Sequence, residues 1–415
     1  MREVKDSGVD WIGVIPIDWT IVRGKSISNF INGYAFDSRN LTSNYHYPVI
    51  RIGDIKNGEV DFDNCIGVNN NSGLDFYRIK KNDVVIAMSG ATVGKIGYIK
   101  EDKEAYINQR VGIIRSDISK YIYYSLSTEN FLKYIMFMNN SSAQPNISSS
   151  TYGNYYFTMP INRNVNKIVC YLDEKCSKIE SIIEKQQKII EKLKEYKLSI
   201  LDEITNGIQG ARCNLGKIAS FKNGINYSDN IEGKSIRFLG VGNFKDFFVL
   251  DDINMFSSIY LKDDISQDYM LKNGDIVFVR SNGSKELVGR AVMVNNVDYP
   301  LTYSGFCIRF RNNRKDIVDD EFILFYFRSS KFRKEIEKNS QGSNINNLNQ
   351  ELLSHISFVI PDLQYQKKMV VKLKRKTVWI DKVIANKTKL IKKFEEYKKS
   401  LIYEVVTGKK EVADL

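Results

Sequence analysis

Two stretches of sequence decide the fold: LDEKCSKIESIIEKQQKIIEKLKEYKLSI at residues 172–200 and LKRKTVWIDKVIANKTKLIKKFEEYKKSL at residues 373–401. In both, apolar residues recur in short helical steps between faces rich in Lys and Glu. This pattern is typical of a long helix with a narrow apolar seam of the coiled-coil type. The predicted seam consists of Leu172, Ile179, Ile183, Ile190, Leu193 and Ile200 in the first stretch and of Leu373, Ile380, Ile384, Ile391, Phe394 and Leu401 in the second.

Each helix needs a partner, because one narrow apolar seam is not stable alone in water. No proline follows Pro160 within the first stretch or Pro361 within the second. Each helix can therefore run about 40 residues, or roughly 60 Å. The simplest partner of each helix is the other one. We expect an antiparallel coiled coil that holds two globular modules at its opposite ends.

The chain is an internal repeat, and the helices are its most regular part. From Pro160 and Pro361 onward the two copies keep a constant offset (361 − 160 = 201). Upstream the offset drifts, as loops of different length require. Each half is therefore a variable module followed by a segment of fixed length. We predict modules at 1–160 and 209–360 and helical segments at 161–208 and 361–415.

The two modules are predicted to be rich in strands. Short β-branched and aromatic runs alternate with Gly and Asn turns, as in 83–86 and its counterpart 276–279. Each module then has one helical stretch, at Tyr121 to Phe137 and at Phe322 to Glu337. The predicted class is α+β, with a pseudo-twofold repeat of a strand-rich domain and a long helix.

The charge of the chain favours a polyanionic partner. Its 415 residues include 61 Lys and Arg against 49 Asp and Glu, a net charge of +12. The excess Lys and Arg could neutralise the phosphates of a nucleic acid and release its condensed counterions, although a solvated basic surface also fits this charge. The sequence has no Cys-x-x-Cys pair, no signal-peptide pattern and no apolar run of membrane-spanning length. We therefore expect a reduced, cytoplasmic protein without a membrane partner.

A Gly/Ser turn and a later tract of amides and hydroxyls occur in both halves. The turns are at 89–95 and 281–285, and the tracts at 139–147 and 339–345. Amides and hydroxyls suit base edges, while Lys and Arg suit phosphates and guanine. Ordinary loops also have such compositions, so both interpretations stay open here. The predicted DNA contacts are Ser89, Thr92, Lys95, Gln144 and Asn146 in the first half and Arg280, Asn282, Lys285, Gln341 and Asn344 in the second.

Motifs for covalent chemistry are missing from the sequence. The only two histidines, His46 and His355, occupy unrelated positions. The segment GATVGK at 90–95 is one residue short of phosphate-loop spacing and is followed by Ile96. No Asn- or Asp-Pro-Pro-aromatic motif of amino-methyltransferases occurs. We expect no catalytic residue and no metal site.

The repeat, the helices and several short motifs together resemble the specificity subunit of type I restriction-modification enzymes. The motifs are KDSGVDWIG at 5–13, DVV at 83–85, SGATVGK at 89–95, QPNI at 144–147 and SLIYEVVTGK at 400–409. The resemblance covers essentially the whole chain. It is the order of the motifs, with the repeat, that makes it specific.

This resemblance implies two target-recognition domains, each reading one half of a split, asymmetric site in double-stranded DNA. It also implies two modification subunits that methylate adenine with S-adenosylmethionine, and restriction subunits that translocate and cut DNA with ATP and Mg²⁺. Those cofactors belong to the partners, so none is expected in this chain. The turn at 281–285 differs from that at 89–95, as half-sites of different sequence require.

Two other functions are compatible with parts of the sequence. A fused methyltransferase or nuclease would recognise DNA by itself, but the missing motifs argue against it. A coiled-coil scaffold that binds only proteins would explain the helices but not two variable modules. An assay of methyl transfer by the chain alone and a DNA-binding assay would separate these alternatives.

Overall fold

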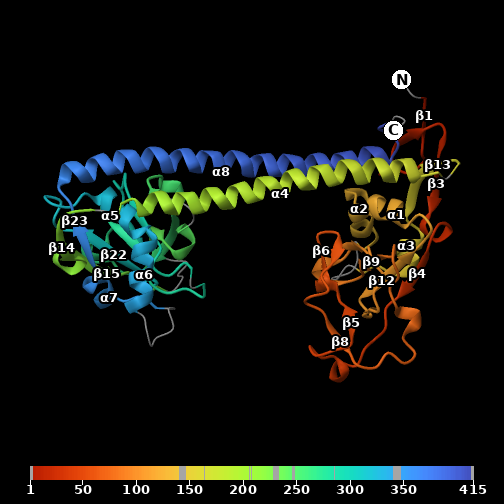
Figure 1. The fold of residues 1–415 in the computed structure, drawn as a ribbon, viewed down its shortest axis with the longest axis horizontal. Helices are drawn as coiled ribbons and strands as arrows, with labels where there is room; N and C mark the ends of the chain where they lie inside the picture. Colours follow the sequence, from red (N-terminus) through yellow and green to blue (C-terminus); the bar gives the residue numbers. More distant parts are fainter. Residues whose placement is uncertain are drawn as a thin grey trace. The chain divides into compact units, whose positions relative to one another are not determined.

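The chain folds as two compact units in the computed structural model. The described residues are 3–139, 146–162, 164–204, 206, 208–227, 233–244, 248–284, 286–339 and 347–412. Unit 1 consists of Met1–Gln186 and Lys389–Leu415, and unit 2 of Gln187–Thr388. Each unit combines a strand-rich module with parts of two long helices, α4 (Asn166–Asp202) and α8 (Leu363–Val406) (Figure 1). The α+β class and the twofold repeat predicted from the sequence are confirmed.

The module of unit 1 contains a four-stranded antiparallel sheet in the order β10-β9-β12-β4 and a three-stranded sheet in the order β11-β5-β8. The strands of the first sheet are β4 (Asn29–Asn32), β9 (Val84–Ala87), β10 (Ile96–Tyr98) and β12 (Val111–Arg115). Those of the second are β5 (Tyr47–Ile50), β8 (Ile66–Val68) and β11 (Tyr106–Ile107). Two-stranded pairs are formed by β1 (Val4–Asp6) with β2 (Val14–Pro16), β3 (Trp19–Arg23) with β13 (Tyr156–Pro160), and β6 (Ile55–Lys56) with β7 (Glu59–Val60).

The module of unit 2 repeats the two sheets, with one added edge strand in the main sheet, and its described residues form one two-stranded pair where unit 1 has three. Its main sheet has the order β15-β22-β19-β20-β17, and a second sheet has the order β18-β16-β21. The main-sheet strands are β15 (Ala219–Asn223), β17 (Val249–Leu250), β19 (Ile276–Val279), β20 (Ala291–Val294) and β22 (Cys307–Asn312). The remaining strands are β16 (Lys234–Leu239), β18 (Ser257–Leu261), β21 (Leu301–Tyr303), and the pair β14 (Ala211–Asn214) with β23 (Ser357–Ile360).

The central strand of each module is apolar throughout because both of its faces are buried. In β9, Val84 and Ile86 pack in the core shared with the module's helices, whereas Val85 and Ala87 pack in a separate core on the other face. Successive side chains of a strand point to opposite faces, so an unbroken apolar run fits this position. The run 276–279 of β19 divides between two cores in the same way.

The helical stretch predicted in each module is in fact two helices. Unit 1 has α1 (Ser119–Leu126) and α2 (Glu129–Met138), and unit 2 has α5 (Asp320–Phe327) and α6 (Ser330–Asn339). At both breaks a hydroxyl captures a main-chain carbonyl of the preceding helix. Thr128 donates to the carbonyl of Ser125, and Ser329 donates to that of Tyr326, both at 2.7 Å. Side-chain bonds of this kind compete with helix continuation. Each module also has a short third helix, α3 (Ser149–Gly153) or α7 (Gln350–His355).

Helices α4 and α8 run antiparallel within each unit. In unit 1, Leu172 and Ile179, early in α4, share a core with Leu401 and Val405, late in α8. In unit 2 the order is reversed, since the core joins the end of α4 to the early part of α8. The predicted antiparallel packing is confirmed. Six of the predicted seam residues are buried, namely Leu172, Ile179, Ile200, Leu373, Ile380 and Leu401, and six are half-buried, namely Ile183, Ile190, Leu193, Ile384, Ile391 and Phe394.

Ion pairs between the two helices obey the same repeat. In unit 2, Lys197 of α4 donates to Asp381 of α8 at 2.6 Å. In unit 1, Lys398 of α8 donates to Glu180 of α4. Both members of one pair lie 201 positions from their counterparts (398 − 197 and 381 − 180). Among the described residues, no helix has the length and hydropathy of a membrane-spanning segment.

Candidate nucleic-acid interface

Three segments of each module meet where its central strand ends. In unit 1, the Met88 N–H donates to the Arg110 carbonyl, and the Ile147 N–H donates to the Met88 carbonyl, both at 2.8 Å. In unit 2, the Arg280 N–H donates to the Phe306 carbonyl at 2.7 Å, and the Leu348 N–H donates to the Arg280 carbonyl at 2.8 Å. A turn, the residue before the neighbouring strand and a third segment, at Ile147 in unit 1 and at Leu348 in unit 2, are thus tied together in the same way twice.

We call this surface the loop edge. In unit 1 it comprises residues 88–95, 108–110 and 146–147, and in unit 2 residues 280–284, 286–290, 304–306 and 347–348. Bridges between Ser89 and Asn146 and between Ser281 and Asn347 extend the pairing. In unit 1 the structure therefore brings the turn together with the end of the tract, which the sequence marks as separate candidates. In unit 2 the turn pairs with Asn347 and Leu348, just beyond the predicted tract, whose residues 340–345 lie outside the described residues.

The turns close with the same geometry but differ in length. In unit 1, the Gly94 N–H donates to the Ala87 carbonyl at 2.9 Å, and in unit 2 the Gly289 N–H donates to the Val279 carbonyl at 2.9 Å. Both glycines have a φ of +81°, a region that residues with a Cβ rarely adopt. The second turn is three residues longer, since 289 − 279 exceeds 94 − 87 by three.

The predicted contacts of unit 1 have different surroundings. Ser89 is half-buried, whereas Lys95 and Asn146 are exposed. The Asn146 N–H donates to the Asn139 side-chain oxygen at 3.0 Å, which fixes the start of the tract. The Thr92 hydroxyl is buried and has no hydrogen-bond partner among the described residues. It would have to move to meet a base.

The predicted contacts of unit 2 are only partly described. Arg280 is half-buried and donates to the Gly305 carbonyl at 3.4 Å. The Asn282 side-chain oxygen accepts from the Ser284 N–H at 2.8 Å, so this residue shapes its own turn. The other predicted contacts lie outside the described residues, namely Lys285, Gln341 and Asn344 of this unit and Gln144 of unit 1.

Sequence reasoning missed the last residues of segments 108–110 and 304–306, which directly precede β12 and β22. Arg110 in unit 1 and Phe306 in unit 2 occupy equivalent positions, because their carbonyls accept the equivalent hydrogen bonds. Arg110 is exposed, and Phe306 is 60% exposed. By the same criterion Lys95 and Arg290 are equivalent. The Lys95 carbonyl accepts the N–H of Ala87, and the Arg290 carbonyl accepts the N–H of Val279. The available sequence signal was a Phe directly after Gly305, at the start of the predicted strand 306–310.

A buried ion pair anchors the other end of each central strand. Arg115 donates to Asp83 and Arg311 donates to Asp275, each at 2.7 Å, and both carboxylates are 2% exposed. Each Asp also accepts the N–H of the residue three positions earlier, Lys80 or Lys272, at 2.7 Å. These carboxylates raise the pKa of both guanidinium groups. The strands that carry the loop edges are thereby fixed in the same position in the two units.

Both halves of the chain match one family. The model of the type I restriction modification DNA specificity domain matches residues 16–209 and 214–405. The specificity subunit of the type I restriction enzyme StySPI from Salmonella potsdam is 24% identical over 397 residues, which cover 89% of this chain and 84% of that protein. The EcoKI specificity subunit of Escherichia coli strain K12 is 23% identical over 345 residues, which cover 77% of this chain and 74% of that subunit.

Two solved structures share the fold of this chain. A chain from a study of complex assembly and conformational transition of the type I R-M system has a TM-score of 0.73 at 13% identity, covering 95% of this chain and 99% of that one. The HsdS subunit from Thermoanaerobacter tengcongensis has a TM-score of 0.51 at 12% identity, covering 95% and 98%. At these identities the likeness establishes the fold, and the two family matches establish that this chain belongs to the type I restriction-modification DNA specificity subunits, which recognise the DNA target.

Proposed function

We propose that the chain recognises a split, asymmetric site in double-stranded DNA, one half-site through each loop edge. The observation that carries this proposal is the repetition of the loop edge on an unchanged framework with different exposed residues. Main-chain bonds hold the three segments in both units, while Arg110 and Phe306 present different chemistry at the same position. Two equivalent surfaces with different side chains suit two half-sites of different sequence.

The two residues at this position favour different base pairs. The guanidinium of Arg110 is a forked donor that matches the O6 and N7 acceptors of guanine in the major groove. The Phe306 ring offers an apolar surface, which matches the methyl group of thymine. Ser89, Asn146 and Asn282 add short polar groups beside them. Lys95 and Arg290 supply charge for phosphates, which position the duplex without specifying its sequence.

The helices supply a repeated surface for partners. In unit 2, Ile189 and Tyr196 of α4 are 38% and 52% exposed, and in unit 1, Leu390 and Tyr397 of α8 are 39% and 52% exposed. Each pair steps by one heptad, and the pairs are related by the repeat (390 − 189 = 201). We infer that these two stripes bind two copies of one helical partner, the modification subunit. Restriction subunits, and the cofactors S-adenosylmethionine, ATP and Mg²⁺, would join through these partners, and the chain itself acts as a non-catalytic cytoplasmic subunit.

Long-read sequencing of methylated adenine in the host genome, with and without this gene, tests the proposal. We expect one split, asymmetric methylated motif to disappear on deletion and to return on complementation. If an active modification subunit is present and every methylated motif survives the deletion, the proposal is wrong. Methyl transfer by the purified chain without partners would instead indicate an enzyme.

A further inference from the structure

A fourth segment of unit 1 lies directly beside the loop edge. It follows β4, which is the strand next to β12 at the end of the four-stranded sheet. The Tyr34 N–H donates to the Ile107 carbonyl at 3.0 Å, and a bridge joins Tyr34 to Asn108. A Cβ on Gly33 would lie 2.0 Å from the Asn108 carbonyl oxygen, so only glycine allows this close approach. Tyr34 is therefore held against the loop-edge segment 108–110.

The ring of Tyr34 is fixed by other aromatic rings. Its centroid lies 5.0 Å from that of Phe36 and 5.2 Å from that of Tyr77. Phe36 and Tyr77 in turn pack against a buried core that consists of Val49, Val68, Leu74 and Tyr106. Because the ring is held in this way, a contact with a ligand would cost little side-chain entropy.

The hydroxyl of Tyr34 is available to a ligand. The residue is 41% exposed, and its hydroxyl makes no hydrogen bond to any residue that the structure describes. A phenol hydroxyl can both donate and accept. A rigid ring thus presents an unused polar group at the rim of the surface that we assign to DNA.

The fold does not require a tyrosine at this position, because unit 2 has none. Ile225 forms with Ser304 the bridge that Tyr34 forms with Asn108. Isoleucine has no polar side-chain group. The same corner is therefore built in both units, and only unit 1 carries a hydrogen-bond donor there.

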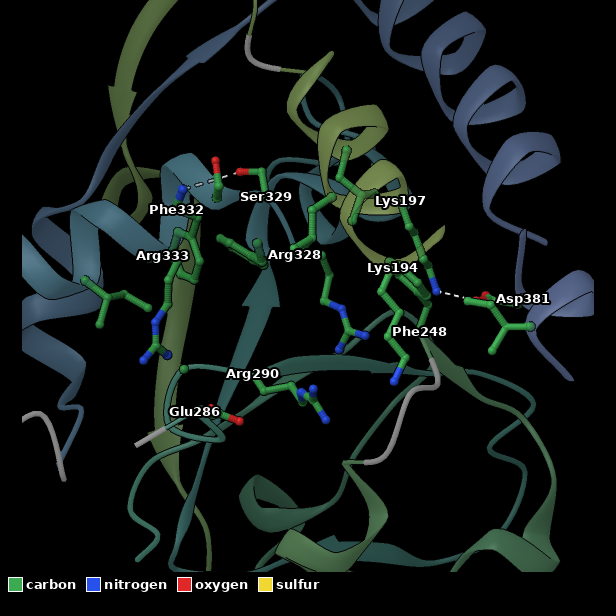
Figure 2. Close-up of a pocket in the computed structure, with 17 residues that line it drawn as sticks. Lys194, Lys197, Phe248, Glu286, Arg290, Arg328, Ser329, Phe332, Arg333 and Asp381 are labelled. Carbon is green, nitrogen blue, oxygen red and sulfur yellow. Dashed lines mark hydrogen bonds and ion pairs between the residues drawn. The ribbon is translucent and has the colours of Figure 1, made fainter. Parts of the chain in front are cut away.

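The cations of the two loop edges also have different surroundings. Lys95 of unit 1 is exposed. Arg290 of unit 2 is half-buried and donates to the Phe244 carbonyl at 3.0 Å. Figure 2 shows Arg290 among the residues that line a cavity of about 470 Å³. Polar groups that could position the duplex thus differ between the units, as the residues that we assign to base reading do.

We propose that the Tyr34 hydroxyl donates to a backbone phosphate beside the base pair that Arg110 reads. This inference rests on the proposed function. A phosphate is favoured over a base, because every base pair offers both donors and acceptors in the major groove and one hydroxyl cannot distinguish them. The position of Tyr34 beside the last strand of the sheet also suits a phosphate, since phosphates flank the bases. The contact would fix the duplex against Arg110 without reading its sequence.

The experiment replaces Tyr34 by phenylalanine in the full chain assembled with its modification subunit. Tyr34→Phe keeps the ring and removes only the hydroxyl, so urea denaturation should be unchanged. We expect the affinity for the split target duplex to fall about tenfold, as for a hydrogen bond to a charged group. The loss should be equal for all duplexes that are substituted at one base pair. The slope of log affinity against log salt should not change, because no charge is removed.

Duplexes that carry a single methylphosphonate locate the contact. This group replaces a charged phosphate oxygen by a methyl group. The ratio of affinities between wild type and Tyr34→Phe should disappear at one modified phosphate and persist at all others. That phosphate should lie next to the base pair at which Arg110→Ala relaxes recognition.

Two further variants separate the hydroxyl from the ring and from other tyrosines. Tyr260→Phe removes an exposed hydroxyl from β18, outside the loop edge, and should leave the affinity unchanged. Tyr34→Ile installs the residue that unit 2 carries and should lose as much affinity as Tyr34→Phe.

Four results would overturn the inference. The first is wild-type affinity of Tyr34→Phe for every duplex. The second is a loss confined to some base substitutions, which would assign the hydroxyl to a base. The third is an affinity ratio that persists at every methylphosphonate position. The fourth is a loss in Tyr34→Ile without one in Tyr34→Phe, which would assign the contact to the ring. A wild-type complex that binds no split site would instead contradict the proposed function.

Discussion

The central strands β9 and β19 begin alike and end differently. Each begins at a carboxylate that is 2% exposed and bonded to an arginine of the neighbouring strand at 2.7 Å. Each ends in a loop edge with the same main-chain bonds, but Arg110 faces solvent in one and Phe306 in the other. The comparison separates what builds the unit from what distinguishes the two units. Buried polar contacts are repeated, and exposed side chains are free to differ.

The largest effect should come from breaking the repeated ion pair. Asp83→Ala and Asp275→Ala each leave a guanidinium without its carboxylate. Because the arginines are partly exposed, we expect each unit to lose about 2–3 kcal/mol of unfolding free energy, below the range for fully buried pairs. Urea denaturation measures this loss. If one variant destabilises its unit and the other does not, the two pairs are not equivalent.

The next effect concerns the exposed helix stripes. Tyr196→Asp and Tyr397→Asp place a charge in the surface that we assign to a partner helix, one in each unit. We expect each to weaken binding of one modification subunit by about 2 kcal/mol, as at an interface hot spot. Native mass spectrometry should then show complexes that have lost one copy. Retention of two copies by both variants would contradict the assignment of the stripes.

Arg110→Ala should relax recognition at one base pair of one half-site. The loss of a forked contact to guanine should reduce discrimination at that base pair by about 2 kcal/mol, or roughly 30-fold. Titration against duplexes substituted one base pair at a time measures it. Lys81→Ala is the matched control, since this exposed lysine lies at the opposite end of β9. A uniform loss across all duplexes would show that Arg110 contacts a phosphate instead.

Phe306→Ala should act in the same way on the other half-site, but more weakly. A contact between an aromatic ring and a thymine methyl should be worth about 1 kcal/mol, or roughly fivefold in discrimination. The same titration applies, with Tyr260→Ala as the control on β18, where the ring is also exposed. Equal affinity of wild type and Phe306→Ala for every duplex would remove Phe306 from the reading surface.

The smallest effect should come from the helix ion pairs. Lys197–Asp381 and Lys398–Glu180 are both partly exposed, so each should contribute about 0.3–1 kcal/mol. Double-mutant cycles with alanine measure the coupling and subtract the contact of Lys197 with the Phe248 ring. We expect equal coupling in the two units, and a coupling confined to one unit would break the symmetry of the pair.

The long helices were predictable because the apolar residues from Leu172 to Ile200 recur at the spacing of a coiled-coil helix. The central strands were predictable for a different reason, namely unbroken β-branched and aromatic runs bounded by Gly and Asn turns. The break between α1 and α2 was not, since it depends on the Thr128 hydroxyl capturing a carbonyl rather than on any period. The loop edge was predicted only in part. Segments at Met88, Arg110 and Ile147 lie far apart in sequence, and only the sheet brings them together.

The central claim is that the two loop edges read two different half-sites. Its most direct test is the adenine methylome of a host in which the wild-type gene is replaced by the Arg110→Ala or the Phe306→Ala variant. We predict that each variant retains a split methylated motif and that each becomes degenerate at one position. The two positions should lie in different half-sites. Degeneracy of both variants in the same half-site, or an unchanged motif in both, would contradict the account.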